Sequence, residues 1–577
     1  DLHRLIRRQR QMCIRDSGTS TTVVRYKEEG TDVIKPIKDA DGVSDIIPSA
    51  IFRVDGQNQT LYGCGALNAK TGGMQGELIT NFKMGLLDVN PEERRIKEAY
   101  IEEFFTYIYK QFWNQTRGIR YDSMDVYVSV PAKWDTDARE VMKRTVKKAG
   151  FGENIICENE PTAAAYTMLH QHLNDFQKTK MLTVQKPMHV FMLDMGAGTT
   201  DIVIFRLKVD SEGRVATDNV LSYPTRDNRT LCGGREIDSI LYNYILESLV
   251  KGTGKSKEEL EQWGIYSVDK AKSWKDKYLS YRLKDNITID TPNDFLPFLK
   301  MSGVSTQQAL QMIRFNRQIF ENETKEHWLE LYKLIESAVA IYKEKYGKEV
   351  KGAEDIDLLF LTGGHSQWYC IPNLFNGEGI NGYIGKDVNN GQGIVKALNF
   401  KKLREEPWRM FGDALPHECV ATGLCLQDSN IKITTPTANN VWVRLTVNEQ
   451  SSDYIQILKV GDLLPVQNKQ SLEVTLSRNL VFGDCNFNIT IELYTGENIE
   501  TANRKILKLR QDENSVLGAL IVAIMVLPIF FPVNYKFKIN LCVDALEDGT
   551  LDVSGDCMMD NRENTRKEFS LKDMQEV

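Results

Sequence analysis
The segment HVFMLDMGAGTTDIVIF, residues 189–205, places a glycine-rich turn between two apolar runs. Each run has the length and the aromatic or β-branched content of a strand, so the glycines are expected in a tight hairpin. Backbone N–H groups of Gly196, Ala197 and Gly198 could close around phosphate oxygens, with Thr199 and Thr200 adding hydroxyls. The carboxylates at the two ends, Asp194 and Asp201, could hold a magnesium ion through water. A plain hairpin fits the same pattern, because a glycine-rich turn alone is not specific.

Two other glycine turns strengthen the phosphate-loop interpretation. Residues 16–21, Asp-Ser-Gly-Thr-Ser-Thr, repeat the hairpin's order of acid, glycine and hydroxyl residues, so Gly18, Thr19 and Ser20 are expected at phosphate. Such self-similarity predicts a duplicated half-domain with a cleft between the halves. Gly363 and Gly364 follow the apolar run 355–362 and would let a base or ribose approach the backbone, although a strand-ending turn is the plainer alternative.

The region from residue 18 to about residue 427 alternates strand and helix patterns. Strands are expected at 127–131 without its Pro131, at 154–158, at 189–195 with 201–205, and at 355–364. Between the first two, apolar residues recur every three or four positions and predict an amphipathic helix that ends at Gly150. Asn159 then reads as the N-cap of a second helix. This alternation is typical of α/β layers.

The remaining chain divides into three kinds of segment. After residue 428, short alternating strands such as 536–555 predict an antiparallel β module at 441–577, joined by a linker at 429–440. Residues 1–17 carry five Arg and have no long apolar core, so we expect a non-native or unstructured leader.

The 577 residues are 42% apolar and 26% charged, which excludes a disordered or fibrous chain.

Charge and cysteine content narrow the partners and the compartment. The net charge of −7 provides no overall attraction to nucleic acid or anionic lipid. Ten scattered Cys without a C-x-x-C motif argue against a disulfide scaffold or a zinc site, so a cytoplasmic location is expected. Residues 516–533, VLGALIVAIMVLPIFFPV, are long enough to span a bilayer. Their two prolines and the alternating segment that follows favour a buried strand, loop and strand instead.

Taken in order, these motifs resemble the 70-kilodalton heat-shock chaperone family, whose ATPase domain shares the actin and sugar-kinase fold. The segments that carry the resemblance are 16–19, 128–132, 159–165, 194–201, 233–238 and 361–364. The resemblance implies a duplicated actin-like, ribonuclease H-like ATPase domain at 18–428. It also implies that residues 441–577 form a β-sandwich similar to the family's peptide-binding domain.

The resemblance also implies roles for individual residues. Lys83 would orient the attacking water at the γ-phosphate, and Asp16, Asp194 and Asp201 would surround magnesium and that water. Pro131, Arg139, Glu160 and Lys83 match the positions that couple the γ-phosphate state to the peptide domain in that family. Glu160 is also expected among the catalytic residues, with Thr199. The further residues expected at the nucleotide are Gly233, Gly234, Gly363, Gly364, His365 and Lys272.

Several positions depart from the family pattern. Ala197 replaces a glycine, which is acceptable only at negative φ. His365 and Gln367 replace the usual Ser and Arg after the double glycine, so adenine recognition needs its own test. The adenosine-clamping helix fits one register through Lys272 and another, one turn later, through Lys277 and Ser280.

The expected function is therefore that of an ATP-hydrolysing chaperone that binds extended or unfolded peptides. ATP or ADP and Mg²⁺ are the expected cofactors, and a J-domain co-chaperone and a nucleotide exchange factor are the partners that the resemblance implies. No nucleic acid partner is expected. The alternatives are a nucleotide-binding switch or scaffold without chaperone activity and, with less support, a small-molecule kinase on the same fold.

Overall fold

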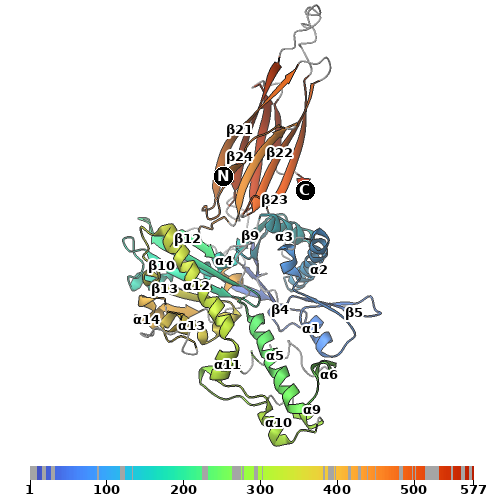
Figure 1. The fold of residues 1–577 in the computed structure, drawn as a ribbon, viewed down its shortest axis with the longest axis vertical. Helices are drawn as coiled ribbons and strands as arrows, with labels where there is room; N and C mark the ends of the chain where they lie inside the picture. The colour runs from blue at the N-terminus through green and yellow to red at the C-terminus, as the bar shows by residue number, and fades with distance from the viewer. Residues whose placement is uncertain are drawn as a thin grey trace, which may run out of the picture. The chain divides into compact units, whose positions relative to one another are not determined.

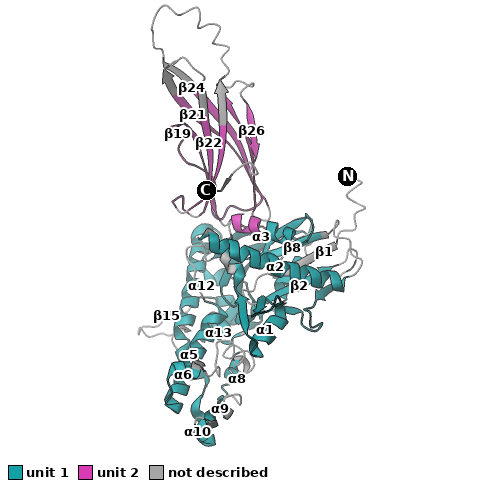
Figure 2. Cartoon of the chain, turned by 90° about the vertical axis from the view of Figure 1, so that its right-hand side faces the viewer, with its two compact units in different colours: residues 1–132, 143–433 teal, residues 133–142, 434–577 magenta. Residues whose placement is uncertain are grey.

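The computed structural model divides by its contacts into two compact units, residues 1–132 with 143–433 and residues 133–142 with 434–577 (Figure 2). The second unit starts inside the expected linker and includes ten residues that the sequence analysis assigned to the ATPase domain. The residues that the structure describes are 10–15, 21–27, 31, 33–87, 90–116, 124–132, 134, 136–223, 232–262, 275, 279–291, 296–301, 303–380, 384–386, 395–396, 398–412, 418–426, 431–437, 439–448, 450–479, 485–496, 498–500, 502–513, 532–546, 550–560, 566–570 and 575–576.

The first six-stranded sheet of unit 1 has the order β3-β2-β1-β8-β9, with β4 also paired to β2. β1 is antiparallel to β2 and parallel to β8, and β8 is parallel to β9. The strands are β1 (Arg10–Arg15), β2 (Thr21–Lys27), β3 (Ile34–Ile37), β4 (Ile46–Pro48), β8 (Met124–Val130) and β9 (Ile155–Asn159).

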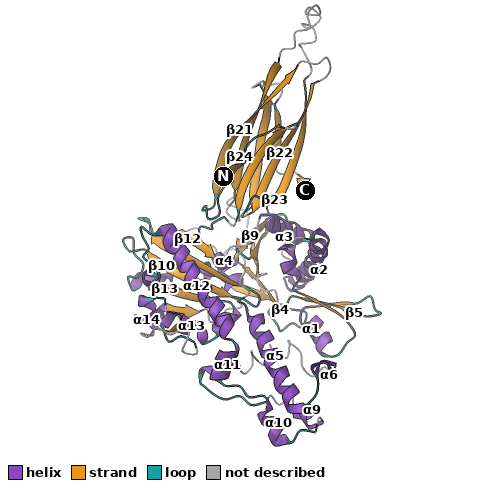
Figure 3. Cartoon of the chain, viewed as in Figure 1, coloured by secondary structure: helices purple, strands orange, loops and turns teal. Residues whose placement is uncertain are grey.

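The second sheet repeats this arrangement, with the order β16-β13-β10-β11-β12-β17 (Figure 3). β10 is antiparallel to β11 and parallel to β13, as β1 is to β2 and β8. The strands are β10 (Met188–Met195), β11 (Thr200–Val209), β12 (Val215–Tyr223), β13 (Leu358–Thr362), β16 (Met410–Gly412) and β17 (Ile431–Lys432). The matching order and directions agree with the expected duplication, and the mixed α/β sheets are consistent with an actin-like fold.

β1 corrects one expectation about the leader. Residues 10–15 lie in the sheet between β2 and β8, so this part of 1–17 is not outside the fold. The physical reason is hydrogen bonding, because β2 and β8 would each present an unpaired backbone edge without a strand between them. The Arg-rich composition concealed the short apolar core Met12, Cys13 and Ile14.

The helices follow from periodicity and end signals. The expected amphipathic helix is α3 (Thr136–Lys148), whose apolar residues Ala138, Val141 and Met142 are buried, and Gly150 follows with φ 108°. The expected N-cap Asn159 precedes α4 (Glu160–Lys178), although its side chain makes no capping bond. α5 (Gly234–Thr253) ends at Gly254 in the left-handed conformation, where glycine has no Cβ penalty.

α12 (Lys325–Tyr346) packs against β11 and β12 and contributes Trp328, Leu331 and Tyr332 to the core of this half of unit 1 (Figure 1). The other helices of unit 1 are α1 (Gly63–Thr71), α2 (Pro91–Gln115), α6 (Lys257–Gln262), α8 (Ser280–Lys284), α9 (Leu296–Met301), α10 (Thr306–Met312), α11 (Arg317–Glu323), α13 (Cys370–Asn376), α14 (Lys401–Glu405) and α15 (Cys419–Leu424). Its 3₁₀ helices are η1 (Phe82–Leu87), η5 (Ala353–Asp355), η6 (Gly364–Gln367) and η7 (Pro407–Arg409). Two smaller sheets join β5 (Ala50–Val54), β6 (Thr60–Tyr62) and β7 (Gly76–Thr80), and β14 (Ile384–Lys386) with β15 (Val395–Lys396).

Unit 2 contains two antiparallel sheets, with orders β19-β18-β22-β23-β27 and β21-β24-β25-β26 and β20 paired to β18. Buried and half-buried residues alternate strictly along β18, and inward side chains from both sheets form one apolar cluster. The strands are β18 (Asn440–Val447), β19 (Gln450–Ser451), β20 (Ile455–Leu458), β21 (Val466–Asn479), β22 (Cys485–Gly496), β23 (Asn503–Glu513), β24 (Pro532–Ala545), β25 (Leu551–Met559), β26 (Lys567–Ser570) and β27 (Gln575–Glu576).

The apolar run 516–533 lies almost entirely outside the described residues. Its last two residues, Pro532 and Val533, begin β24 and pair in register with Asn479 and Arg478 of β21. In the part of the chain that the structure describes, no helix has the length and apolar content needed to cross a membrane.

Candidate functional site
The centre of the site is the end of the β10–β11 hairpin. Asp194 and Asp201 are opposite each other in the strand register, and both side chains are buried. The turn between them is closed by a 2.9 Å hydrogen bond from Gly196 N to Thr199 O. Thr200 Oγ1 donates to the Cys232 carbonyl and so ties the hairpin to the segment before α5. The local sequence pattern thus brings two carboxylates to one end of a glycine hairpin.

The start of α5 packs directly on this hairpin. Gly234 N donates to Gly196 O at 3.1 Å and Arg235 N donates to Ala197 O at 2.8 Å. A β-carbon on Gly233 would stand 2.6 Å from Ala197 O, so only glycine fits. Ala197 is not among the described non-glycine residues with positive φ, which explains why alanine is accepted at that position.

The third glycine turn approaches the same hairpin from β13. Thr362 pairs in register with Asp194, and the chain then turns at Gly363 with φ 81°. A β-carbon on Gly363 would stand 2.5 Å from Asp194 Oδ1. His365, two residues further, faces Gly234 of α5. The structure therefore brings together three of the predicted segments, 194–201, 233–234 and 363–365.

Lys83 belongs to the other half of unit 1. It lies in η1 with 3% of its surface exposed, and its Nζ donates to Thr22 Oγ1 of β2 at 2.7 Å. Thr22 in turn shares a 3.0 Å hydrogen bond with Ser49. Arg235 of α5 hydrogen-bonds Asn81, two residues before Lys83, and thereby ties the Lys83 segment to the start of α5. A buried lysine held by a hydroxyl is unlike an ordinary surface lysine.

A second buried lysine, Lys275, lies beside Gly234 and was not predicted from the sequence. Lys275 forms a buried ion pair with Asp238 of α5, with a distance of 2.6 Å from Nζ to Oδ1. The same Nζ is 3.3 Å from the Gly234 carbonyl. Lys272, which was predicted for this region, and the alternative Lys277 lie outside the described residues. The spacing of charges along the chain could not reveal which lysine turns toward α5.

The structure describes Pro131, Arg139 and Glu160, which are expected to couple the domains. Glu160 is buried at the first position of α4, and Pro131 directly follows β8. Arg139 is buried within unit 2, and its Nε donates to the Trp134 carbonyl at 3.0 Å. Their role in coupling stays a prediction.

The first phosphate motif covers residues 16–21. Asp16, Gly18, Thr19 and Ser20 lie outside the described residues. Within the described residues, no three His, Cys, Asp or Glu side chains form a group that could hold a metal directly. The buried carboxylates Asp194 and Asp201 fit a magnesium ion bound through water, since hard oxygen ligands and retained waters are what this ion prefers.

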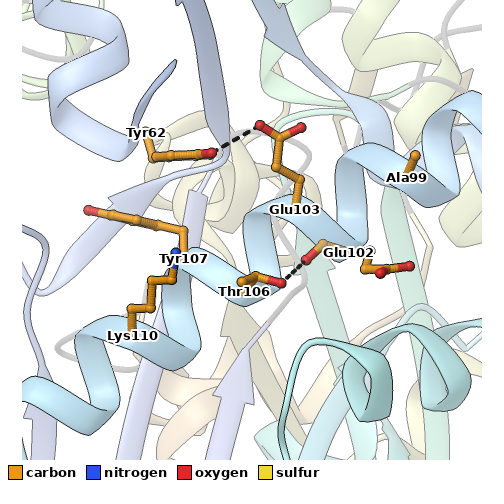
Figure 4. A pocket seen from close by; sticks show the side chains of 7 residues that line it. All are labelled: Tyr62, Ala99, Glu102, Glu103, Thr106, Tyr107 and Lys110. Atoms are coloured by element: carbon orange, nitrogen blue, oxygen red, sulfur yellow. Dashed lines mark hydrogen bonds between the residues drawn. The ribbon is translucent and has the colours of Figure 1, made fainter. Parts of the chain in front are cut away.

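A pocket of about 350 Å³ elsewhere in unit 1 contains none of the predicted site residues (Figure 4). Tyr62 donates to Glu103 Oε1 at 2.9 Å, and the Tyr62 and Tyr107 rings stack at 4.8 Å. The pocket has no glycine turn, and Tyr62 and Glu103 already satisfy each other. Its lining residues are Tyr62, Ala99, Glu102, Glu103, Thr106, Tyr107 and Lys110.

Comparison with known proteins supports the resemblance seen in the motifs. Residues 118–320 match the family model of the Hsp70 protein. This range includes Pro131, Arg139, Glu160, the β10–β11 hairpin and the start of α5, but neither Lys83 nor Gly363.

A heat shock protein homolog of Encephalitozoon cuniculi is 30% identical over 132 residues, a match that covers 23% of this chain and 18% of that protein. The aligned part is thus a small fraction of the relative's length. With the family-model match over residues 118–320, it shows that part of the chain is similar to the Hsp70 protein family.

Proposed function
We propose that unit 1 binds ATP or ADP with Mg²⁺ at the β10–β11 hairpin and hydrolyses ATP. The observation that carries this proposal is the packing of two further glycine segments, at Gly233 and Gly363, on the glycine hairpin that carries two buried carboxylates. The absence of a β-carbon at Gly233 and Gly363 lets both segments pack closely against the hairpin. Phosphoryl transfer depends on positioning and charge neutralisation, and such an arrangement supplies both.

Each part of the site would have its own task. The backbone of residues 196–198 would hold phosphate oxygens, and Gly363 with Gly364 would face the nucleoside. Asp194 would hold magnesium through water, with Asp16 as the partner expected from the first motif. The ion would neutralise charge on the phosphates. Lys83, fixed by Thr22, would orient the attacking water.

We further propose that unit 2 is a β-sandwich that binds extended peptides. Its two antiparallel sheets and their shared apolar cluster support a sandwich. The similarity to the Hsp70 family supports peptides as ligands and a J-domain co-chaperone and an exchange factor as partners. The scattered cysteine spacing, with no C-x-x-C motif, supports the reducing cytoplasm as the proposed compartment.

Residues 133–142 supply a route for coupling nucleotide state to peptide binding. They belong by their contacts to unit 2, while the chain on either side belongs to unit 1. Within unit 2, Lys505 Nζ of β23 lies 2.7 Å from Asp137 Oδ1, and Asn503 Nδ2 donates to Asp137 Oδ2 at 3.0 Å. A nucleotide that biases the position of this segment would act directly on β23.

Steady-state ATP hydrolysis by the full chain, with and without an unfolded peptide, tests the proposal. Hydrolysis that the peptide stimulates is the expected result. Tight ADP binding with no hydrolysis and no peptide effect would instead identify a nucleotide-dependent switch or scaffold. Phosphorylation of a small polyol would identify a kinase.

A further inference from the structure
A chain of three side chains leads from the surface of unit 1 to the double glycines. Glu236 of α5 lies with its Oε2 2.6 Å from Nδ1 of His327, whose side chain is completely buried in α12. His327 Nε2 lies 3.1 Å from Nε2 of His365, which follows Gly364 in η6. The Glu236 carboxylate is the outer end of this chain and is 43% exposed. Such a chain can determine which ring nitrogens carry protons.

The inner end of the chain faces the glycines of the candidate site. His365 is 5% exposed, and its Nδ1 has no hydrogen-bond partner within the described residues. A β-carbon on Gly234 would stand 3.5 Å from this Nδ1 and 3.4 Å from Lys275 Nζ. The space between the imidazole, the ammonium and the α5 backbone is therefore kept open by the absence of a side chain on Gly234.

The direction of the hydrogen bonds follows from the chemistry of Glu236. A carboxylate only accepts, so His327 Nδ1 must donate to it. The 3.1 Å contact between the two Nε2 atoms holds one proton, which the arrangement proposed below places on His365 Nε2. This leaves a lone pair and no proton on His365 Nδ1. A buried acceptor without a partner is costly, which makes it a place where a donor on a ligand would be stabilised.

Burial and the nearby charges oppose a second proton on this ring. Desolvation, then His327 and Lys275, hold the pKa of His365 well below its usual range. The charged groups around the ring are Lys275 and Asp238, which form an ion pair with each other, and Glu236 at the far end. At neutral pH the ring is therefore uncharged and His365 Nδ1 can accept a hydrogen bond.

We propose that Glu236 and His327 are positioning residues that hold His365 in the tautomer whose Nδ1 accepts a hydrogen bond from the nucleoside part of the bound nucleotide. This inference rests on the proposed function and adds a specificity determinant to it. The donor on the ligand is a ribose hydroxyl or the exocyclic amine of the base, since both present an O–H or N–H to an acceptor. The position of His365 directly after the Gly363-Gly364 turn favours the nucleoside over the phosphates.

Binding of four diphosphates by the full chain distinguishes these donors. ADP is compared in calorimetric titrations with 2′-deoxy-ADP, 3′-deoxy-ADP and purine riboside 5′-diphosphate, each of which lacks one donor. We expect one of the three analogues to bind roughly tenfold more weakly than ADP. In His365→Phe, which keeps a ring to stack on Trp328, ADP and that analogue should bind alike within about twofold.

The hydrogen-bonded series Glu236–His327–His365 is tested at Glu236, its exposed end, where a substitution disturbs the core least. Glu236→Gln keeps an oxygen that can accept from His327, so it should preserve the discrimination between ADP and the analogue. Glu236→Leu removes that acceptor and should lose most of the discrimination, while near-ultraviolet circular dichroism checks that the fold is retained. In the unliganded wild type, ¹⁵N NMR of the histidine rings should show His365 Nδ1 unprotonated at pH 7.5.

The outcomes separate this inference from the proposed function. Equal binding of all four diphosphates, or an undiminished preference in His365→Phe, would overturn the inference while leaving nucleotide binding intact. A proton on His365 Nδ1 in the NMR spectrum would overturn it independently of any ligand. Failure of every diphosphate to bind would overturn the proposed function, and the inference with it.

Discussion
Gly363 lies so close to Asp194 that a β-carbon would stand 2.5 Å from the carboxylate oxygen Oδ1. Gly363 also adopts φ 81°, which side-chain-bearing residues rarely adopt. The turn after β13 and the carboxylate at the end of β10 therefore fit together only because residue 363 is glycine. This packing connects the nucleoside side of the site to its magnesium side.

Replacing this glycine should damage both stability and binding. Gly363→Ala is expected to lower the free energy of unfolding by about 2–4 kcal/mol, because backbone strain and a steric clash add. It should also weaken ADP binding by roughly tenfold or more, since Asp194 must move. Gly303→Ala is the matched control, because Gly303 has the same φ of 81° with no neighbour within 4 Å. It should cost only about 1–2 kcal/mol and leave ADP affinity unchanged. Equal effects of the two substitutions on stability and on ADP affinity would show that the contact between residue 363 and Asp194 contributes to neither.

Lys83 should matter for turnover more than for binding. Lys83→Met is expected to lower the rate of ATP hydrolysis by roughly 100-fold or more, because a fixed positive charge at the attacking water is lost. ADP affinity should stay within about threefold of wild type. Lys70→Met, at an exposed lysine of α1, should leave both values unchanged. ATP hydrolysis by Lys83→Met at the wild-type rate would show that Lys83 does not take part in the reaction.

Lys505 tests the coupling route. Lys505→Ala breaks the 2.7 Å contact with Asp137 without touching the nucleotide site, so basal hydrolysis should be unchanged. Stimulation by an unfolded peptide should fall at least about threefold, because segment 133–142 loses an ionic tie to β23. Lys508→Ala, at an exposed position of the same strand, serves as the control. If both variants respond to peptide like wild type, coupling does not pass through Asp137.

The stability of the chain should decline as pH falls from about 7 to 5. Burial lowers the pKa of His365, and burial also lowers that of His189, so the unfolded chain binds protons that the folded chain does not. The free energy of unfolding then falls with decreasing pH by up to about 1.4 kcal/mol per pH unit for each histidine, starting near pH 6.5. Urea titrations at pH 7.5, 6.5 and 5.5 give the slope of the free energy of unfolding against pH. In His365→Phe this slope should be smaller, by the contribution of up to one proton. His170→Gln, at an exposed histidine of α4, should keep the wild-type slope. An unchanged slope in His365→Phe would show that the ring takes up its proton in the folded chain as well.

The local parts of the fold could be predicted because their signals are short-range. The β10–β11 hairpin is encoded by two apolar runs and the glycines between them, and the buried face of α3 by apolar residues at helical spacing. The three glycine turns carry phosphate-loop chemistry in their own residues. The contacts of Gly233 with Ala197 and of Gly363 with Asp194 were not predicted, because they depend on packing between segments that are distant in the sequence.

The parts that escaped prediction depend on packing between distant segments. His327 and His365 are 38 positions apart and meet only because α12 and η6 pack together, so neither residue's neighbours in the sequence signal the pair. Lys275 was not predicted, since the spacing of charges along the chain does not reveal which lysine pairs with Asp238. The leader was set aside on composition, whereas β1 is held by pairing with β2 and β8.

The central claim, that unit 1 binds a nucleotide against the glycine turns, is tested most directly by calorimetric titration of the full chain with ADP and Mg²⁺. We predict saturable binding of one ADP per chain, and its loss in Gly233→Val, whose side chain would collide with Ala197 O and the Gly198 backbone. The absence of saturable binding by the wild-type chain, or binding that Gly233→Val leaves unchanged in a folded protein, would contradict the claim.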